Sequence, residues 1–415
     1  MTLSFGFGTG SQSVSVPEEN LLGALHMNPA APERTGQEAV GYALENPIGL
    51  ARLSEIVPKS KKIAIVTSDI SRPCPSWDIL PPLLAELERG GVDLADVTLV
   101  FGLGSHRHQT EAEMRHLAGP AFDRIRCVDS DCNDCIRMGV TGRGTPVDIT
   151  RVVAEADFRI CLGNVEYHYF AGYSGGAKAI MPGVSSRDAI QANHRMMVQN
   201  EACAGRLEGN PLRMDIEEAG RICGIHYIVN VVLDEHKQII FAAAGDVTAA
   251  HRAGCRYLDT LYRKPIPQRA DIILVSQGGA PKDLNLYQTQ KALDNAKHAV
   301  RPGGIIILIG SCKEGLGEKC FERWIQEAKC SHDLIDRVQT HFELGGHKAA
   351  AIAMVLENAR IFLVSEMDPE LARKCFLEPY SSAQKALDDA FAILGSNATV
   401  LAMPYGGSTL PIVEQ

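Results

Sequence analysis

The sequence predicts an α/β protein with two domains, each built on a mostly parallel sheet flanked by helices. First, 415 residues with 45% hydrophobic side chains suffice for two or three domains with substantial cores. Second, short apolar runs repeatedly end in Gly, Ser, Asp or His and give way to helical patterns, an alternation typical of parallel sheets. Third, the segment YRKPIPQRA at 262–270 places two prolines and three basic residues before a fresh strand, which is typical of a linker.

Six apolar runs are the main predicted strands. They are KKIAIVTSD (61–69), VTLVFGLGSH (97–106), FRICLGNVEYH (158–168), ADIILVSQGG (270–279), GGIIILIGSC (303–312) and RIFLVSEM (360–367). A linker at 262–270 gives a first domain over residues 1–261 and a second over 262–415. A last strand, ATVLAMPYGG (398–407), fits either domain. We expect the active site in the cleft between the two domains.

Charge and composition narrow the class of partner. The formal net charge is −9, and acidic and basic residues are interspersed, so no basic patch for nucleic acid is indicated. The N-terminus lacks the basic and apolar regions of a signal peptide, and the longest apolar runs have the length of strands. We therefore expect a soluble cytoplasmic protein that binds a small molecule, without nucleic-acid or membrane partners. The twelve cysteines, irregularly spaced, are expected to be reduced.

One group of cysteines has the spacing of a metal-cluster loop. Cys127, Cys132 and Cys135 form C-x4-C-x2-C, as in plant-type iron–sulfur proteins, which need a fourth thiolate from elsewhere. The segment is acidic, which disfavours an anionic cluster, and no glycine-rich loop surrounds it. We therefore favour free thiols at these positions.

Polar residues follow three predicted strands at the edge where ligands bind to parallel sheets. Asp69 and Arg72 follow the first strand, His106 and His108 the second, and His168 the third. The two histidines of HRH alternate along an extended segment, so they point to opposite sides and only one is expected to face the site. Arg72 offers a rigid fork for a carboxylate or phosphate, although it could equally be solvated.

A glycine-rich turn, GYSGGAK at 172–178, supplies backbone N–H groups and the cation of Lys178. It is not a phosphate-binding Walker loop, because Ala179 follows the lysine, and no G-x-G-x-x-G follows any strand, so a nicotinamide site is poorly supported. His194 lies in a predicted helix capped by Ser185 or Ser186. Taken alone, the turn and the histidine are also compatible with structural roles.

Gln288 and Lys291 lie three positions apart in a predicted helix of the second domain, and therefore on one face. An amide beside an ammonium suits a polar oxyacid, although such pairs are also common on solvated helices.

Several of these segments together resemble one family. The chain is similar to lactate racemase and its homologues, the nickel-pincer nucleotide enzymes. The resemblance is carried by TSDISRP (67–73), GSHRHQT (104–110), GRGTPVDIT (142–150), EYHYFAGYSGGAKAIMPG (166–183), NH (193–194) and LYQTQK (286–291). These segments extend over both predicted domains, and the one around Lys178 is the most specific.

The resemblance implies a cofactor and a reaction. Lys178 would carry a nickel-pincer nucleotide, Ni(II)-pyridinium-3,5-bisthiocarboxylic acid mononucleotide, through a thioamide link, and His194 would complete the nickel coordination. His106 and His168 would be the catalytic acid and base, which exchange roles when the substrate changes hand. The activity implied is that of a racemase or epimerase of 2-hydroxy acids.

Further residues are assigned by the same resemblance. The positions that would hold the cofactor besides Lys178 are Asp69, Ile70, Ser71, Arg72, Gly175 and Gly176. Arg72, Gln288 and Lys291 would contact the substrate. The cofactor needs dedicated biosynthesis, so cofactor-biosynthesis proteins are expected partners. The matched motifs leave the oligomeric state and the identity of the 2-hydroxy acid open, so lactate, malate, longer or aromatic hydroxy acids and sugar acids all remain candidates.

Chemical reasoning favours hydride transfer for such a substrate. Removing the C2 proton would add a second negative charge next to the ionised carboxylate and give a dianionic enediolate, whereas hydride removal gives a planar keto acid if a base takes the hydroxyl proton. Imidazole, with a pKa of about 6.5, can serve as base for one hand and acid for the other. Two alternatives remain: a zinc-dependent lyase or hydrolase using His106, His108 and His194, and a non-catalytic carrier of the nickel nucleotide.

Overall fold

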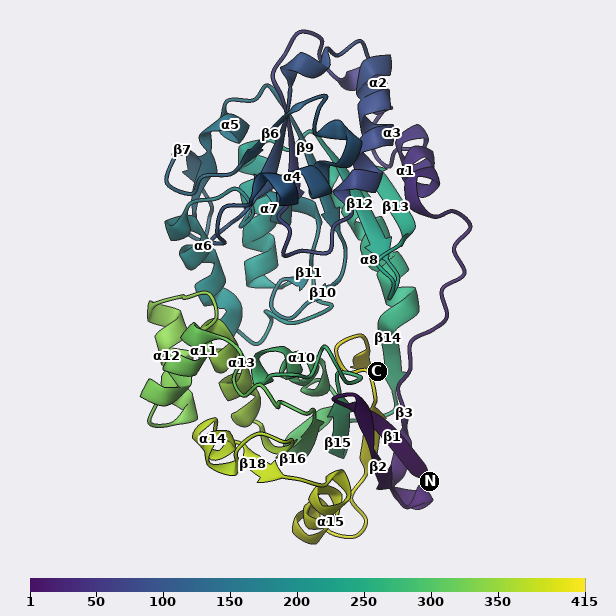
Figure 1. The fold of residues 1–415 in the computed structure, drawn as a ribbon, viewed down its shortest axis with the longest axis vertical. Helices are drawn as coiled ribbons and strands as arrows, with labels where there is room; N and C mark the ends of the chain where they lie inside the picture. Colours follow the sequence, from purple (N-terminus) through teal and green to yellow (C-terminus); the bar gives the residue numbers. More distant parts are fainter. Residues whose placement is uncertain (415) are drawn as a thin grey trace. The chain divides into compact units, whose positions relative to one another are not determined.

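In the computed structural model, which describes residues 1–414, the chain forms two compact units (Figure 1). One unit is the continuous segment Pro29–Leu261. The other combines Met1–Asn28 with the chain from Tyr262 onward. Each unit contains a six-stranded sheet, so the predicted α/β class is confirmed.

The sheet of the unit Pro29–Leu261 has the order β13-β12-β9-β4-β5-β6. Only the edge pair β12 and β13 is antiparallel. The strands are β4 (Ile63–Ser68), β5 (Val97–Gly102), β6 (Arg126–Asp129), β9 (Phe158–Asn164), β12 (Tyr227–Leu233) and β13 (Ile239–Gly245). The central strands β4 and β9 are almost fully buried and mostly apolar, as expected for a parallel sheet covered on both faces.

Helices α1 (Gly36–Glu45) and α3 (Ser76–Arg89) contribute to the core on one face of this sheet, where Leu44 and Leu83 pack in the same cluster as Ile65. The remaining helices of the unit are α2 (Leu53–Ile56), α4 (Glu111–Ala118), α5 (Arg151–Ala154), α6 (Arg187–His194), α7 (Pro211–Cys223) and α8 (Val247–Tyr262). Two small antiparallel pairs complete the unit: β7 (Cys135–Val140) with β8 (Pro146–Thr150), and β10 (Tyr167–His168) with β11 (Gly172–Tyr173).

The sheet of the other unit has the order β18-β17-β16-β15-β19-β3 and is parallel throughout. Its strands are β3 (Leu21–Ala24), β15 (Ala270–Ser276), β16 (Val300–Ile309), β17 (Ala359–Val364), β18 (Glu378–Tyr380) and β19 (Val400–Met403). Its helices are α9 (Leu286–Thr289), α10 (Lys291–Ala296), α11 (Lys319–Glu327), α12 (Ser331–Thr340), α13 (His347–Leu356), α14 (Pro369–Lys374) and α15 (Ala383–Leu394). The hairpin β1 (Thr2–Phe7) and β2 (Gly10–Ser15) contributes Phe5 and Val14 to its core.

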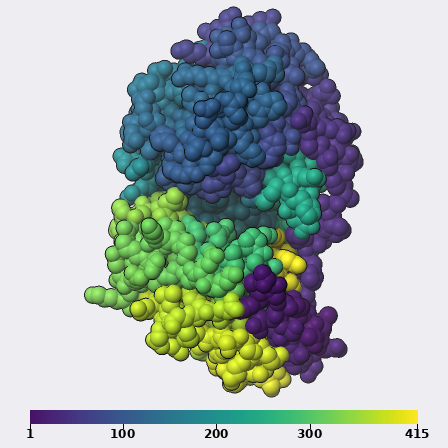
Figure 2. Space-filling model, viewed as in Figure 1, coloured from purple at the N-terminus to yellow at the C-terminus, as the bar shows by residue number. Residues whose placement is uncertain are grey.

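The first 28 residues differ from the prediction, which placed them in the domain of residues 1–261. They belong with the C-terminal half because β3 pairs with β19, and the hairpin packs on the same core. Figure 2 shows these N-terminal residues, in purple, against C-terminal residues of the same unit. The predicted last strand, which fitted either domain, is β19 beside β15.

The segment predicted as a linker is partly a strand. The units divide between residues 261 and 262, but β14 (Arg263–Ile266) pairs in parallel with β20 (Leu410–Val413). Pro265 has no backbone N–H to donate. It is tolerated in β14 because this strand pairs with a neighbour on one side only.

Candidate active site

The candidate site lies in the unit Pro29–Leu261, at the point where its sheet reverses direction. The chain enters the sheet at β4, adds β5 and β6 on one side, and then adds β9 on the other. Loops that leave the carboxyl ends of strands beside such a switch point diverge, and ligands bind there in open α/β sheets. The predicted residues Asp69, His106 and His168 all follow these strands.

Asp69 and His106 form the best-defined contact of the site. Asp69 is buried, with 3% of its surface exposed, and its Oδ2 lies 2.5 Å from Nδ1 of His106. Its Oδ1 accepts hydrogen bonds from both the backbone N–H and the hydroxyl of Ser71. Burial opposes ionisation of Asp69, but the hydrogen bonds from His106 and Ser71 outweigh it and lower the pKa of the carboxyl below its usual value. Asp69 therefore remains an acceptor for His106.

Arg72 faces the other nitrogen of the same imidazole. Its Nη2 lies 3.4 Å from Nε2 of His106. A guanidinium can only donate, so Nε2 is the acceptor of this contact, and Nδ1 carries the proton that Asp69 accepts. His106 therefore has its lone pair at Nε2, and the guanidinium of Arg72 beside it is a cation that can bind a carboxylate.

The loop of Asp69 is held by a residue that the sequence analysis missed. Gln109 is buried and its Oε1 accepts from the backbone N–H of Ile70 at 2.8 Å. Asp129, at the end of β6, accepts from both the backbone and the amide of Gln109. Gln109 lies next to the HRH turn, but nothing in its sequence context indicated burial.

The two histidines of the HRH turn separate as predicted. The side chain of His106 is 22% exposed and faces Asp69, whereas that of His108 is 76% exposed and lies 3.2 Å from Asp129. The turn ends where Thr110 caps α4 in a reciprocal capping box with Glu113, which fixes the start of that helix.

His168 lies on β10, just before the glycine-rich turn. Its Nδ1 accepts the backbone N–H of Ala171 at 3.3 Å, so a neutral His168 carries its proton at Nε2. Its ring stacks with Tyr169 and meets Phe170 edge-on, with centroids 4.4 Å apart. His106 and His168 thus occur in opposite tautomers.

The glycine-rich turn requires its glycines. Gly175 and Gly176 have φ values of 74° and 59°, where side chains are strained. A Cβ at Gly175 would lie 2.8 Å from Oδ1 of Asn230, which accepts the Gly176 N–H. A Cβ at Gly176 would lie 2.9 Å from the guanidinium of Arg213. The turn therefore packs closely against β12 and α7, and it ends in the short helical turn that carries Lys178.

Lys178 is a half-buried lysine with an unusually acidic ammonium group. Burial, followed by the positive charges of Arg213 and Arg72, lowers its pKa to about 7. Arg213 is itself buried, 1% exposed, and donates to Glu217 and to the carbonyl of Tyr173. Near neutral pH the Lys178 amine is therefore partly deprotonated and nucleophilic.

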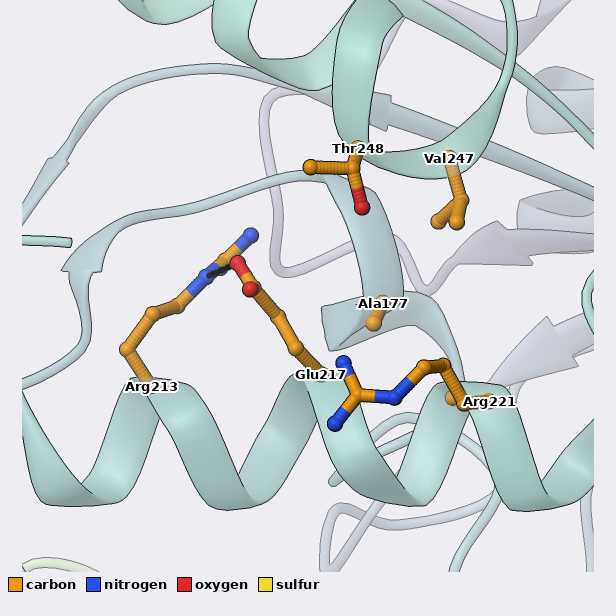
Figure 3. Close-up of a pocket in the computed structure, with 7 residues that line it drawn as sticks. Ala177, Arg213, Glu217, Arg221, Val247 and Thr248 are labelled. Atoms are coloured by element: carbon orange, nitrogen blue, oxygen red, sulfur yellow. Dashed lines mark hydrogen bonds and ion pairs between the residues drawn. The ribbon is translucent and has the colours of Figure 1, made fainter. Parts of the chain in front are cut away.

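A small pocket under the turn, of about 10 Å³, is lined by Ala177, by α7 residues including Arg213, Glu217 and Arg221, and by the start of α8 (Figure 3). In Figure 3 the Arg213 guanidinium lies against the Glu217 carboxylate. The pocket has room for about one water molecule, so it is not a ligand site. A larger cavity, of about 200 Å³, borders Ile70 and Arg72 and is lined in part by Trp77, His116 and Lys237.

We expect the apoprotein to show this lowered pKa in its reactivity. An ordinary lysine, with a pKa of about 10.4, is scarcely neutral at pH 7, whereas an amine with a pKa of about 7 is half neutral. Acetylation of Lys178 by a small reagent, followed by peptide mass spectrometry, should therefore rise with pH and level off above about pH 8. Exposed Lys385, whose pKa the hydrogen bond to Asp389 raises, is the internal reference and should keep rising. A Lys178 curve that parallels Lys385 would contradict the assignment.

Phe170, which no sequence motif marked as a site residue, contacts three of the predicted site residues. Its buried ring lies 4.4 Å from the His168 ring, 5.0 Å from the His194 ring and 5.8 Å from Nζ of Lys178. Three of the predicted site residues, His168, His194 and Lys178, therefore lie around one aromatic ring, whereas His106 contacts Asp69, Ser71 and Arg72. His194 is 7% exposed and ends α6, a helix that Ser186 caps as predicted.

Gln288 and Lys291 belong to the other unit. The predicted single helix is two short helices, because Gln290 separates α9 from α10. A further cation was missed: Lys348, on α13, is 8% exposed, donates to the carbonyl of Tyr287 at 3.2 Å and lies 4.1 Å from the centre of its ring.

Within residues 1–414, no three His, Cys, Asp or Glu side chains gather where they could hold a metal ion. The zinc set of His106, His108 and His194 is therefore not assembled. Cys127, Cys132 and Cys135 are free thiols, as predicted. Burial raises the pKa of Cys127 and Cys135 to about 11, which keeps these thiols protonated.

Known lactate racemases match nearly the whole length of this chain. Lactate racemase of Thermoanaerobacterium thermosaccharolyticum is 31% identical over 97% of both chains, and that of Lactiplantibacillus plantarum is 32% identical over 95% of this chain and 96% of its own. The solved lactate racemase apoprotein from T. thermosaccharolyticum has a TM-score of 0.88, with 30% identity and full coverage of both chains. A protein from Thermotoga maritima, with a TM-score of 0.64 and 18% identity, covers 93% of this chain and all of its own, and shares the fold.

Fold and site together define a two-unit α/β enzyme with its titratable groups gathered at a sheet switch point. The sequence matches the families described as "Lactate racemase N-terminal domain" over residues 7–205 and "Lactate racemase C-terminal domain" over residues 266–410. The chain belongs to the lactate racemase family, and thus to the racemases, a class of isomerase. In the part of the chain that the structure describes, no helix is long and apolar enough to span a membrane.

Proposed function

We propose that the protein inverts C2 of a 2-hydroxy acid by hydride transfer, using a nickel-pincer nucleotide attached to Lys178. The observation that carries the proposal is the pair of opposite tautomers: His106 presents a lone pair at Nε2, while a neutral His168 presents a proton there. Oxidation and re-reduction of an alcohol need one group that accepts a proton and one that donates it. The two histidines supply both in the same resting state.

The residues of the site fit the proposed cofactor. Lys178 has a nucleophilic amine, with a pKa of about 7, beside a turn whose glycines allow close approach to the backbone. The Phe170 ring contacts both His194 and Lys178: its centroid lies 5.0 Å from that of the His194 ring and 5.8 Å from Nζ of Lys178. When bound, the cofactor would supply an electron-poor carbon that accepts hydride from C2 and returns it.

The chain's own residues would handle the substrate and its proton. Arg72 would hold the carboxylate near His106, whose Nε2 would accept the hydroxyl proton of one enantiomer. Asp69 would keep the ring oriented and stabilise it once it is charged, since its own lowered pKa keeps it ionised. His168 would return a proton to the carbonyl oxygen after the planar keto acid has presented its other face. Gln288 and Lys291 are proposed further contacts for the substrate.

The test uses protein produced together with the cofactor-biosynthesis proteins, which we propose as partners. Single enantiomers of 2-hydroxy acids of increasing size, labelled with deuterium at C2, are incubated and the products analysed on a chiral column and by mass spectrometry. We expect the opposite enantiomer to appear with deuterium still at C2, and turnover slower than with the unlabelled acid. Loss of deuterium to solvent would contradict hydride transfer. Cofactor bound without turnover of any acid would favour a carrier.

A further inference from the structure

A series of buried polar side chains, joined by hydrogen bonds, ends at His194. Thr141, Asp215 and Asn193 are 4%, 0% and 0% exposed, respectively. Thr141 Oγ1 lies 2.5 Å from Oδ1 of Asp215, whose Oδ2 lies 2.7 Å from Nδ2 of Asn193. Oδ1 of Asn193 lies 3.1 Å from Nδ1 of His194. The series of hydrogen bonds thus extends from the turn between β7 and β8, through α7, to the end of α6.

The direction of each hydrogen bond in this series follows from the groups around Thr141. The oxygen of Thr141 accepts the backbone N–H of Thr145 at 3.1 Å, so its hydroxyl proton is directed to Asp215. The second oxygen of Asp215 is then an acceptor for the Asn193 amide.

The orientation of the Asn193 amide is equally determined. Two acceptors, Oδ2 of Asp215 and the carbonyl of Leu212, lie 2.7 and 3.3 Å from the same end of the amide, which must therefore be its NH₂ group. The oxygen consequently faces Nδ1 of His194. Because an amide oxygen can only accept, Nδ1 must carry a hydrogen.

We infer that Thr141, Asp215 and Asn193 are positioning residues that fix His194 in its Nδ1–H tautomer, with the lone pair of the neutral ring at Nε2. The inference rests on the proposed function for its purpose, which is to prepare Nε2 as the nickel ligand. An imidazole whose other nitrogen donates to a fixed acceptor is oriented and made more basic toward a metal. Deleting one such partner typically lowers metal affinity by about 10- to 100-fold.

The apoprotein provides a test that does not depend on activity. Two-bond proton–nitrogen correlation spectra of protein labelled with ¹⁵N-histidine distinguish the tautomers, and His194→Gln identifies the signals of His194. We expect protonated Nδ1 and unprotonated Nε2 near neutral pH. Finding the proton at Nε2 in the wild-type protein would overturn the inference, whether or not the protein is later shown to be a racemase.

Asp215→Asn is the sharpest variant because it keeps the shape and reverses one hydrogen bond. Thr141 still donates to the oxygen of the new amide, whose NH₂ then faces Asn193 and favours turning it round. We expect the Nε2–H tautomer to gain population at His194, and loaded protein to lose nickel to a chelator about 10- to 100-fold more readily. Asp188→Asn, on the exposed face of the same helix as His194, is the matched control and should change neither.

If Asp215→Asn changes neither the tautomer nor nickel retention, these hydrogen-bonded side chains do not position His194 and the inference fails. If Asp215→Asn does not fold, the wild-type spectrum and Asn193→Leu decide the question, because the leucine removes the acceptor and should release the fixed tautomer. Failure of the wild-type protein to take up nickel would count against the proposed function alone, since the tautomer is read in the apoprotein.

Discussion

Replacing Lys178 by alanine is expected to abolish both covalent cofactor attachment and racemisation. The reason is that the Lys178 amine, with a pKa of about 7, is the nucleophile beside the glycine-rich turn that could form the link. Intact-mass measurement of protein produced with the biosynthesis proteins should show an added mass on the wild-type chain and none on the variant. Chiral assay of the variant should give the rate of a blank.

Lys178→Arg and Lys385→Ala serve as controls for this experiment. Arginine keeps a cation at position 178 but remains protonated, so it should also fail to carry the cofactor. Exposed Lys385 should be replaceable without loss of mass or activity. A variant at position 178 that still inverts its substrate, without added mass, would refute the tethered mechanism.

Changing His106 or His168 to glutamine is expected to lower racemisation in both directions by about 10²- to 10⁴-fold, the usual contribution of a general acid or base. Each complete inversion needs one histidine to take the proton and the other to give it, so neither single variant should retain one direction at the normal rate. The measurement is kcat/KM for each enantiomer, with cofactor content determined in the same preparations.

His108→Gln is the matched control, because His108 is in the same turn but points away from Asp69 and is largely exposed. We expect nearly normal rates from it. If His106→Gln behaves like His108→Gln, His106 is not the proton acceptor and its tautomer has no role in catalysis.

The sequence predicted the local features of the site well. Strand ends are marked by the change from apolar to polar residues, so the placement of Asp69, His106 and His168 at carboxyl ends followed directly. The capping box of Thr110 and the N-cap of α6 are likewise encoded within four residues. The alternation of His106 and His108 followed from extended backbone geometry.

Long-range features were not visible in the sequence. Arg213 and Asp215 fall in a helix with ordinary amphipathic spacing, and only the structure shows that their side chains are buried. Phe170 looked like one aromatic among several, because its role depends on where α6 ends relative to the turn. The segment of strand β3 was assigned to the wrong domain because its partner β19 is about 380 residues away along the chain.

That pairing has a consequence for synthesis. The unit Pro29–Leu261 is complete once its own residues have been made, so it can fold while the remainder of the chain is still being translated. The opening 28 residues must wait, because the edge they extend does not exist until residues 400–403 leave the ribosome. The lysine and the three histidines of the candidate site therefore belong to the unit that is made first, and the helices that carry Gln288 and Lys291 belong to the unit that is completed last.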